Sequence, residues 1–257
     1  MAEGVDLDSR HLVADKQDGV LTVRIDRPDR RNSLTIEMYH GIKKACVVAE
    51  RDPDIDLVVI TGSGDYFCVG GEMGDQHEGG AQIDRFTDAL DLTPFVQLER
   101  CPKLVLMRIN GMCQGGGLVM TLMSDLSIVS DKAKFRVPEL LRGVADCYLG
   151  ARLAPRIGVA RAKYLLYTAQ YFSAQDALDM GLISRVVPHE ELDAAVAETI
   201  AQVRLTGPAA RRALKRDINR SLPPIDLGMF QDSLVGEECK EGFRAFVGKR
   251  PPEWPEI

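Results

Sequence analysis

The chain has 257 residues, which is enough for one large domain or two small ones with a sizeable core. Its 32 basic and 38 acidic residues give a formal charge of −6, and only 6% of the residues are aromatic. A nucleic-acid binder normally carries a basic surplus, so we expect no nucleic-acid partner, although a local basic patch can still hold a small polyanion. No apolar run reaches the roughly 18–20 residues that span a bilayer, and the acidic start shows no hydrophobic targeting segment. We therefore expect a cytoplasmic protein with no membrane partner.

The cysteine pattern indicates reduced thiols in a protein core. None of the six cysteines belongs to a C-x-x-C pair, which argues against zinc-ribbon and thioredoxin-like motifs. We expect core thiols and no metal site. The cysteines are Cys46, Cys68, Cys101, Cys113, Cys147 and Cys239.

Strand-like and helix-like segments alternate in the first two-thirds of the chain. Some segments alternate apolar and polar residues, as a half-buried strand does, and others are continuously apolar, as in a strand buried on both faces. The predicted strands are 20–25, 57–61, 103–109 and 126–130. A helix follows the first of them, with its N-cap at Ser33 or Thr35 and its end before Pro53. One face of this helix carries Met38, Ile42, Cys46 and Ala49.

Helices dominate after about residue 148, where the strand signals fade. The segment 173–181 has a hydroxyl N-cap, an acid three positions later and a glycine past its end, which predicts a capped helix. Further helices are predicted at 190–203, 208–220 and 227–249. This order favours an α/β body followed by a helical region.

Two glycine clusters can present backbone amides to a ligand. Val69–Gly71 lies in a loop after one strand, and Gly115–Gly117 lies between another strand and the start of a helix. Neither cluster fits the dinucleotide or phosphate-loop pattern, which disfavours nucleotide binding by those modes. Two amides aimed at one point would form an oxyanion hole. The alternative is that both clusters are tight turns or packing glycines.

Eight motifs in register resemble those of the crotonase superfamily, the enoyl-CoA hydratase/isomerase family. They are Arg27-Pro…Asn32-Ser-Leu34, Val58–Gly62, Tyr66–Gly71, Ile109–Gly117, Ser124–Leu126, Phe135–Glu139, Ala177–Ile183 and Glu241–Arg250. The resemblance runs from about residue 12 to 253. It implies an α/β fold with a ββα spiral core, at 1–200, and a helical C-terminal region, at 201–257, that builds a homotrimer or a dimer of trimers. It also implies an acyl-CoA thioester substrate, with coenzyme A as part of that substrate and no prosthetic group.

The same resemblance assigns roles to individual residues. It implies that the amides of Gly71 and Gly116 hold the thioester oxygen while an enolate forms. Hydratases of the family use two glutamates, and the chain matches one of them with Glu139 but has Val119 at the other position. Val119 cannot transfer a proton, so a single-glutamate enoyl-CoA isomerase, with Glu139 as base and proton shuttle, is the first hypothesis. The plain alternative for Glu139 is a first-turn helix acid or a surface ion pair.

Asp146 is the second candidate acid. In the naphthoate-synthase branch an aspartate seven residues after the glutamate position acts in the active site, and Asp146 stands at that offset from Glu139. With Asp146 active, the chain resembles a hydratase or another branch of the superfamily, such as a hydrolase, a decarboxylase or a cyclase. The alternative is a solvated loop residue. Cys68 and Cys147 lie near this site in the resemblance and are interpreted as packing residues.

Coenzyme A contacts are also implied by the resemblance. They involve the turn after the first strand, the first glycine loop and the end of the last helix, where a lysine can reach the coenzyme A of a neighbouring subunit. The residues are Arg30, Arg31, Ser33, Leu34, Gly71, Phe246 and Lys249. We expect the loop 72–95 to line the acyl pocket. A third hypothesis is a weakly catalytic acyl-CoA-binding protein that has lost the acid at position 119.

Overall fold

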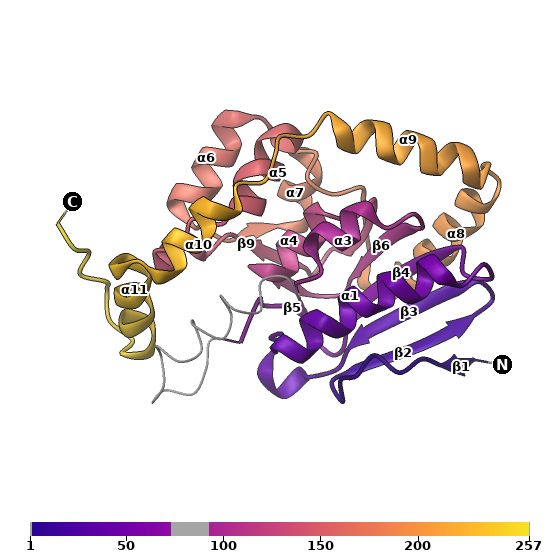
Figure 1. Cartoon of the computed structure of the whole chain (residues 1–257), viewed down its shortest axis with the longest axis horizontal. Coiled ribbons are helices and arrows are strands. Elements are labelled where there is room, and N and C mark those ends of the chain that lie inside the picture. Colours follow the sequence, from indigo (N-terminus) through magenta and orange to yellow (C-terminus); the bar gives the residue numbers. More distant parts are fainter. Residues whose placement is uncertain (1, 73–92, 257) are drawn as a thin grey trace.

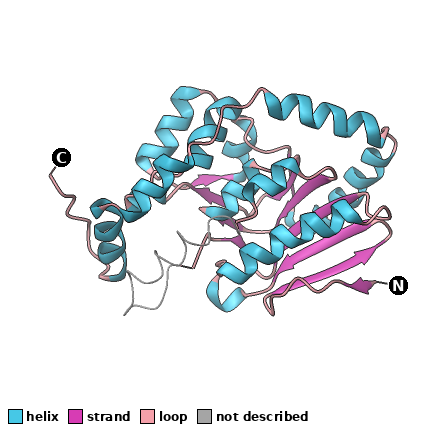
Figure 2. Cartoon of the chain, in the orientation of Figure 1, coloured by secondary structure: helices cyan, strands magenta, loops and turns pink. Residues whose placement is uncertain are grey.

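Two β-sheets organise the described part of the chain, residues 2–72 and 93–256, in this computed structural model (Figures 1 and 2). The larger sheet begins with an antiparallel edge and continues with parallel strands. Its strand order is β1 (Glu3–Gly4), β2 (Leu12–Gln17), β3 (Val20–Ile25), β4 (Leu57–Gly62), β6 (Leu104–Ile109), β8 (Leu126–Ser130) and β11 (Arg185–Val187). The smaller sheet has the order β10 (Phe172–Ser173), β9 (Lys134–Arg136), β7 (Met112–Gln114) and β5 (Tyr66–Cys68).

Successive turns of the chain repeat one pattern, a strand in the large sheet, a strand in the small sheet and then a helix. Strands β4 and β5 are followed by α3 (Phe95–Arg100), β6 and β7 by α4 (Gly116–Leu122), and β8 and β9 by α5 (Cys147–Ile157). Because each turn adds one parallel strand to each sheet, the chain advances as a spiral. The expected ββα spiral is confirmed. The loop 72–95, expected to line an acyl pocket, lies almost entirely outside the described residues.

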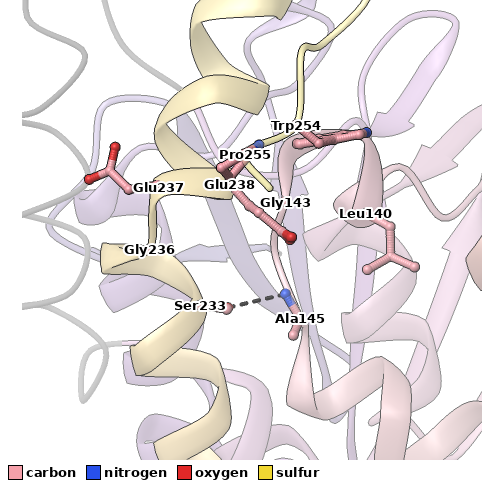
Figure 3. A pocket seen from close by; sticks show the side chains of 9 residues that line it. All are labelled: Leu140, Gly143, Ala145, Ser233, Gly236, Glu237, Glu238, Trp254 and Pro255. Carbon is pink, nitrogen blue, oxygen red and sulfur yellow. Dashed lines mark hydrogen bonds between the residues drawn. The ribbon is translucent and has the colours of Figure 1, made fainter. Parts of the chain in front are cut away.

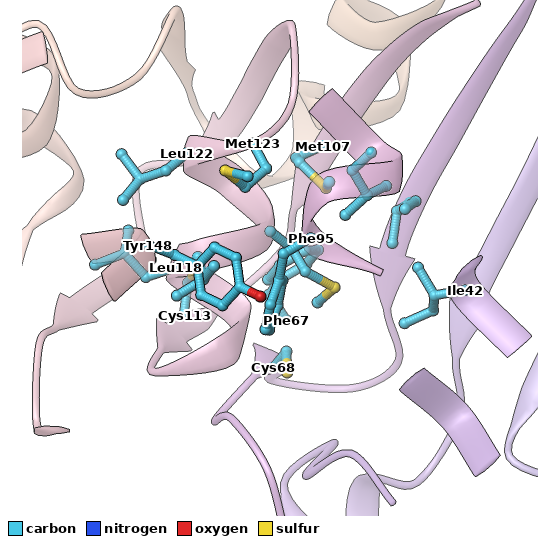
Figure 4. Packing of buried hydrophobic residues seen from close by; sticks show 14 of the residues in the cluster. Ile42, Phe67, Cys68, Phe95, Met107, Cys113, Leu118, Leu122, Met123 and Tyr148 are labelled. Carbon is cyan, nitrogen blue, oxygen red and sulfur yellow. The ribbon is translucent and has the colours of Figure 1, made fainter. Parts of the chain in front are cut away.

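The first helix, α1 (Ile36–Arg51), covers β3 and β4 (Figure 1). Thr35 is its N-cap, because its side chain accepts a hydrogen bond from the amide of Met38. The four residues predicted to share a face are all buried. They join a core that continues through β5, β6 and α4 to Tyr148 of α5 (Figure 4).

The second half of the chain is mainly helical, with 3₁₀ turns η3 (Glu139–Arg142) and η4 (His189–Glu191). Its remaining helices are α6 (Val159–Thr168), α7 (Ala174–Asp179), α8 (Leu192–Arg204), α9 (Pro208–Arg220), α10 (Leu227–Val235) and α11 (Glu237–Val247). Ser173 and Asp176 form the predicted capping box of α7. The predicted single helix 227–249 is wrong, because the chain breaks at Gly236 and a new helix starts with two acids in its first turn. The boundary predicted at 200 falls inside α8, and the trimer-building role of 201–257 stays a prediction.

Two ion pairs with little solvent exposure link helices of the spiral to each other and to the later helical region. The guanidinium of Arg152 binds both carboxylate oxygens of Glu99, at 2.5 and 3.0 Å. The ammonium group of Lys215, on α9, lies 2.7 Å from a carboxylate oxygen of Asp125. These contacts join α5 to α3 and α9 to the start of β8.

All six cysteines are free and buried, as predicted. Along the part of the chain that is described, no helix combines the length and the apolar character needed to cross a membrane.

Candidate active site

The two predicted glycine loops meet backbone to backbone. A Cβ atom on Gly70 would lie 3.2 Å from the amide nitrogen of Gly116 and 3.4 Å from the Cα of Gly115. A Cβ on Gly117 would lie only 2.5 Å from the carbonyl oxygen of Cys68. Gly70 and Gly115 also have positive φ, which side chains disfavour. The glycines therefore allow the loop after β5 to touch the loop before α4.

Two amides at this junction are available to a ligand. The amide of Leu34 donates to the carbonyl of Gly70, and the amide of Glu72 donates to the carbonyl of Leu34. This parallel bridge directs the amide of Gly71 away from Leu34. Gly116 is the first residue of α4, so its amide has no acceptor within the helix. Among residues 2–72 and 93–256, neither the Gly71 nor the Gly116 amide has a hydrogen-bond acceptor.

Glu139 lies at the same junction. One carboxyl oxygen, Oε1, is 3.3 Å from the point that a Cβ on Gly115 would occupy. The other, Oε2, is buried and has no hydrogen-bond partner in the described residues. Burial, and after it the charge of Asp146, raises the pKa of Glu139 to about 8. Glu139 is the first residue of η3, but it is neither exposed at a helix end nor part of an ion pair in the described structure.

Asp146 is the N-cap of α5 rather than a residue of a solvated loop. Its Oδ1 accepts a hydrogen bond of 2.9 Å from the amide of Leu149. Burial raises the pKa of Asp146 to about 6, although the amides of Leu149 and Tyr148 lower it in part. Since its charge also raises the pKa of Glu139, the two carboxyls are close enough to interact. At neutral pH the pair therefore favours an ionised Asp146 beside a protonated Glu139.

Val119 and the two nearby cysteines show no acid–base capacity. Val119 is fully buried in α4 and belongs to the main core (Figure 4 shows its neighbours Leu118 and Leu122). Burial raises the pKa of Cys68 and of Cys147 to about 12, so both thiols stay protonated. This agrees with the interpretation of both cysteines as packing residues.

Tyr39 is a site residue that the sequence reasoning missed. Its hydroxyl lies 3.1 Å from the position of a Cβ on Gly71 and 2.6 Å from that of a Cβ on Gly116. The side chain comes from the first turns of α1 and is buried. A tyrosine among the apolar residues of this helix face is the only sequence signal for it.

The turn expected to contact coenzyme A lies directly beside the Gly71 loop. Buried Asn32 fixes the turn, because its side-chain amide donates to the carbonyls of Ser63 and Tyr66 at 2.9 and 2.7 Å. Arg27 links the turn to the loop, since its guanidinium donates to Ser33 and to Glu72. The other predicted members here have these positions: Arg30 and Arg31 are exposed, Ser33 is half-buried, and Leu34 is buried against Gly70.

Phe246 lies on α11 and Lys249 follows it, and α11 packs on η3, the turn that begins with Glu139. This helix packs on η3 so closely that a Cβ on Gly242 would lie 2.5 Å from the carbonyl carbon of Arg142. The Phe246 ring is half exposed and stacks on the Arg142 guanidinium, 3.8 Å from it. Lys249 is exposed. Their contact with coenzyme A stays a prediction.

A pocket of about 560 Å³ lies beside the segment that joins Glu139 to Asp146 (Figure 3). Its lining residues are Leu140, Gly143, Ala145, Ser233, Gly236, Glu237, Glu238, Trp254 and Pro255. Neither carboxyl of the site lines it, so we do not assign it to the acyl chain. Within the described ranges, no three His, Cys, Asp or Glu side chains are grouped as metal ligands would be.

The sequence and the fold are similar to those of known proteins. The model of the enoyl-CoA hydratase/isomerase family matches residues 15–256, and the chain belongs to this family. A crotonyl-CoA hydratase from Syntrophomonas wolfei is 32% identical over 250 residues, which cover 93% of this chain and 96% of that protein. A short-chain-enoyl-CoA hydratase from Clostridium acetobutylicum is 29% identical over 256 residues, with coverage of 96% and 98%. The crystal structure of a carnitinyl-CoA hydratase from Mycobacterium avium has a TM-score of 0.81 at 29% identity and covers 96% of this chain and 98% of its own.

Proposed function

We propose that this enzyme hydrates a 2-enoyl-CoA thioester, with Glu139 and Asp146 as its two acid–base groups. The observation that carries the proposal is the pair of interacting carboxyls, with pKa values of about 8 and about 6, beside two available amides. When the surroundings of two carboxyls give them different pKa values, the one with the higher pKa can act as the acid and the other as the base. The similar proteins bear the names of hydratases, so hydration takes the first place that single-glutamate isomerisation had on the sequence alone.

The reaction needs one proton removed and one delivered. The Asp146 carboxylate takes a proton from water, and the water oxygen bonds to the β-carbon of the substrate. The electrons of the double bond move toward the thioester, whose oxygen accepts hydrogen bonds from the amides of Gly71 and Gly116. The Glu139 carboxylic acid then delivers its proton to the α-carbon. Asp146 ends protonated and Glu139 ionised, and proton exchange with solvent restores the starting state.

In this proposal Asp146 supplies the carboxyl that Val119 cannot. The family resemblance implies that hydratases carry a glutamate at the position of Val119, on α4. Here the second carboxyl comes instead from the N-cap of α5, where helix amides partly stabilise its ionised form.

Single-glutamate isomerisation is the second candidate. Two observations favour it, the buried valine at position 119 and the hydrogen bond that engages Asp146 as a helix cap. An ionised Glu139 would then remove the α-proton of a 3-enoyl thioester and return it at the γ-carbon. The substrate in either case is an acyl-CoA.

We also propose a homotrimer or a dimer of trimers. The proposal is supported by two apolar side chains of α9, Leu214 and Ile218, which are each 62% exposed and could be covered by another subunit.

The pH dependence of kcat/KM separates the two candidates. Hydration needs an ionised Asp146 and a protonated Glu139, so the rate should be highest between about pH 6 and about pH 8, the pKa values of the pair. Isomerisation needs an ionised Glu139, so its rate should rise with pH through about 8. The loss of conjugated absorbance from a 2-enoyl-CoA, and its gain from a 3-enoyl-CoA, report the two reactions.

Asp146→Asn makes the same distinction by mutation. Asparagine keeps the N-cap of α5 but cannot transfer a proton, so hydration should fall about 10²–10⁴-fold. An isomerase would instead keep its activity, with the rise moved to lower pH, because Glu139 would lose the neighbouring negative charge that raises its pKa. Asp226→Asn is the matched control, since Asp226 caps α10 through Met229 in the same way. Tight binding of a CoA ester without turnover of either substrate would contradict both candidates.

A further inference from the structure

Tyr39 reaches the glycine junction from α1, a helix that belongs to neither glycine loop. The three atoms nearest to a Cβ built on Gly71 all belong to Tyr39, with the hydroxyl oxygen first at 3.1 Å. On Gly116 the same hydroxyl is again the nearest atom, at 2.6 Å. The hydroxyl therefore lies close to both of the residues whose amides are available to a ligand.

The position of this hydroxyl depends on packing at both ends of the ring. Tyr39 is only 4% exposed, and Phe95 of α3 meets its ring edge to face at a centroid distance of 5.7 Å. An alanine at position 116 would put its methyl group 2.6 Å from the hydroxyl, which would have to move, and an alanine at position 71 would put one at a tight 3.1 Å. The position of Tyr39 therefore depends on glycine at both position 71 and position 116.

We propose that the Tyr39 hydroxyl is a third hydrogen-bond donor to the thioester oxygen, beside the amides of Gly71 and Gly116. The inference rests on the proposed function, because it uses the same substrate oxygen. A phenol in a buried site strengthens its hydrogen bond as negative charge develops on the acceptor, so it would stabilise the enolate more than the bound substrate. It would add to the site a donor from α1, a helix outside both loops.

The surroundings keep this group in its donor form. Burial raises the pKa of Tyr39 well above its ordinary value, and the acids Asp146 and Glu139 add to the shift. The phenol therefore stays protonated throughout the pH range in which the two carboxyls titrate. It can donate a hydrogen bond, while the carboxyls exchange the protons.

Tyr39→Phe tests the proposal, because it keeps the ring and removes only the hydroxyl. Removal of one donor from an oxyanion hole lowers kcat by about 10²–10³-fold, and we expect at least the lower value with KM changed less than about threefold. Tyr164→Phe is the control, since the Tyr164 hydroxyl is on exposed α6 and contacts Gln170. A Tyr39→Phe enzyme with kcat within about twofold of the parent would overturn the proposal.

A binding measurement makes the test independent of turnover. A chromophoric arylacryloyl-CoA should absorb at longer wavelength when donors polarise its thioester carbonyl, and the shift should be smaller in Tyr39→Phe. If the parent enzyme turns over neither enoyl-CoA but shows this difference, the proposed function fails and the role of Tyr39 stands. An equal shift in both proteins, or none in the parent, would overturn the role of Tyr39.

Gly71→Ala completes a double-mutant cycle. The new methyl group would press on the hydroxyl in the parent but meet no hydroxyl in Tyr39→Phe. We therefore expect Gly71→Ala to lower kcat at least about tenfold in the parent and clearly less in the Tyr39→Phe background. Equal losses in both backgrounds would contradict a shared action of the two residues on one oxygen.

Discussion

Carboxyls with little solvent exposure lie under α9 and at the glycine junction, and of these two groups only the one under α9 forms ion pairs within the described residues. Under α9, Asp125 accepts hydrogen bonds from Lys215 and from the amide of Val105, at 2.7 and 2.8 Å. The two carboxylate oxygens of Glu99 accept hydrogen bonds from Nε and Nη2 of Arg152. At the glycine junction, Glu139 has one buried oxygen without a partner in the described residues, and its interacting neighbour is a second acid.

The comparison distinguishes carboxyls whose burial stabilises the fold from carboxyls whose burial prepares them for proton transfer. Burial raises the pKa of Asp125 as well, but Lys215 opposes the shift and holds the charged form in place. Glu139 forms no ion pair within the described residues, and although the charge of Arg142 lowers its pKa in part, burial and Asp146 raise it to about 8, where it can exchange a proton near neutral pH. Partners, rather than burial, therefore distinguish the candidate catalytic carboxyls from the structural ones.

Lys215→Met should have the largest effect on stability. It leaves Asp125 buried without its counter-charge, and breaking such a pair costs about 3–5 kcal/mol in free energy of unfolding. Urea denaturation followed by circular dichroism measures this loss. Lys240→Met is the control, because Lys240 and Glu237 form an exposed pair that solvent screens, so its loss should leave the free energy of unfolding almost unchanged. Equal losses in the two variants would remove the distinction between the regions.

Glu139→Gln should have opposite effects on activity and on stability. We expect kcat/KM to fall about 10²–10⁴-fold, because the acid–base group is lost. The raised pKa means that the folded state holds a proton the unfolded state releases above pH 4.5, so the parent loses stability as pH rises toward 8. The Glu139→Gln variant has no titrating group at this position, so it does not lose stability in this way as the pH rises. Its melting temperature should exceed that of the parent at pH 9 and match it near pH 4, at roughly 2–4 °C for each kcal/mol.

Thermal unfolding at both pH values checks the sign. A Glu139→Gln protein that is less stable than its parent at pH 9 would place Glu139 among the structural carboxyls, with Asp125. Retained activity with either enoyl-CoA would remove it from the chemistry altogether.

Local patterns predicted the glycine loops and the strands β3, β4, β6 and β8 of the larger sheet, whereas the spiral itself was implied by the family resemblance and the strands of the smaller sheet were not predicted. The apolar runs of β4 and β6, and glycines between strand and helix, are readable over a few residues. Strand β11 escaped prediction, since three residues carry no clear period and their place beside β8 is set by a distant pairing. The break at Gly236 was also missed, although a glycine followed by two acids is a local signal for a helix start.

The site was predictable where the motifs name residues and not where contacts are long-range. Glu139 and the two glycine loops were found in advance, and the structure brings them together. The burial of Asp146 was not visible, because it depends on how η3 and α5 pack. Tyr39 was missed for the same reason, since its contacts with Gly71 and Gly116 join parts of the chain that no local pattern relates.

The ion pair of Arg27 is less buried than those under α9, and its loss should have the smallest effect on stability. It forms an ion pair of 2.8 Å with Glu72, next to Gly71, and its side chain is 12% exposed against 30% for Glu72. Because the pair is partly solvated, its loss should cost about 1 kcal/mol in free energy of unfolding. Arg27→Ala measured against Arg27→Lys, which keeps the charge, tests this by urea denaturation followed by circular dichroism. A fall in kcat without a loss of stability would instead make Arg27 part of the support for the Gly71 amide, through its hydrogen bonds to Ser33 and Glu72, and so connect it to the stabilisation of the enolate.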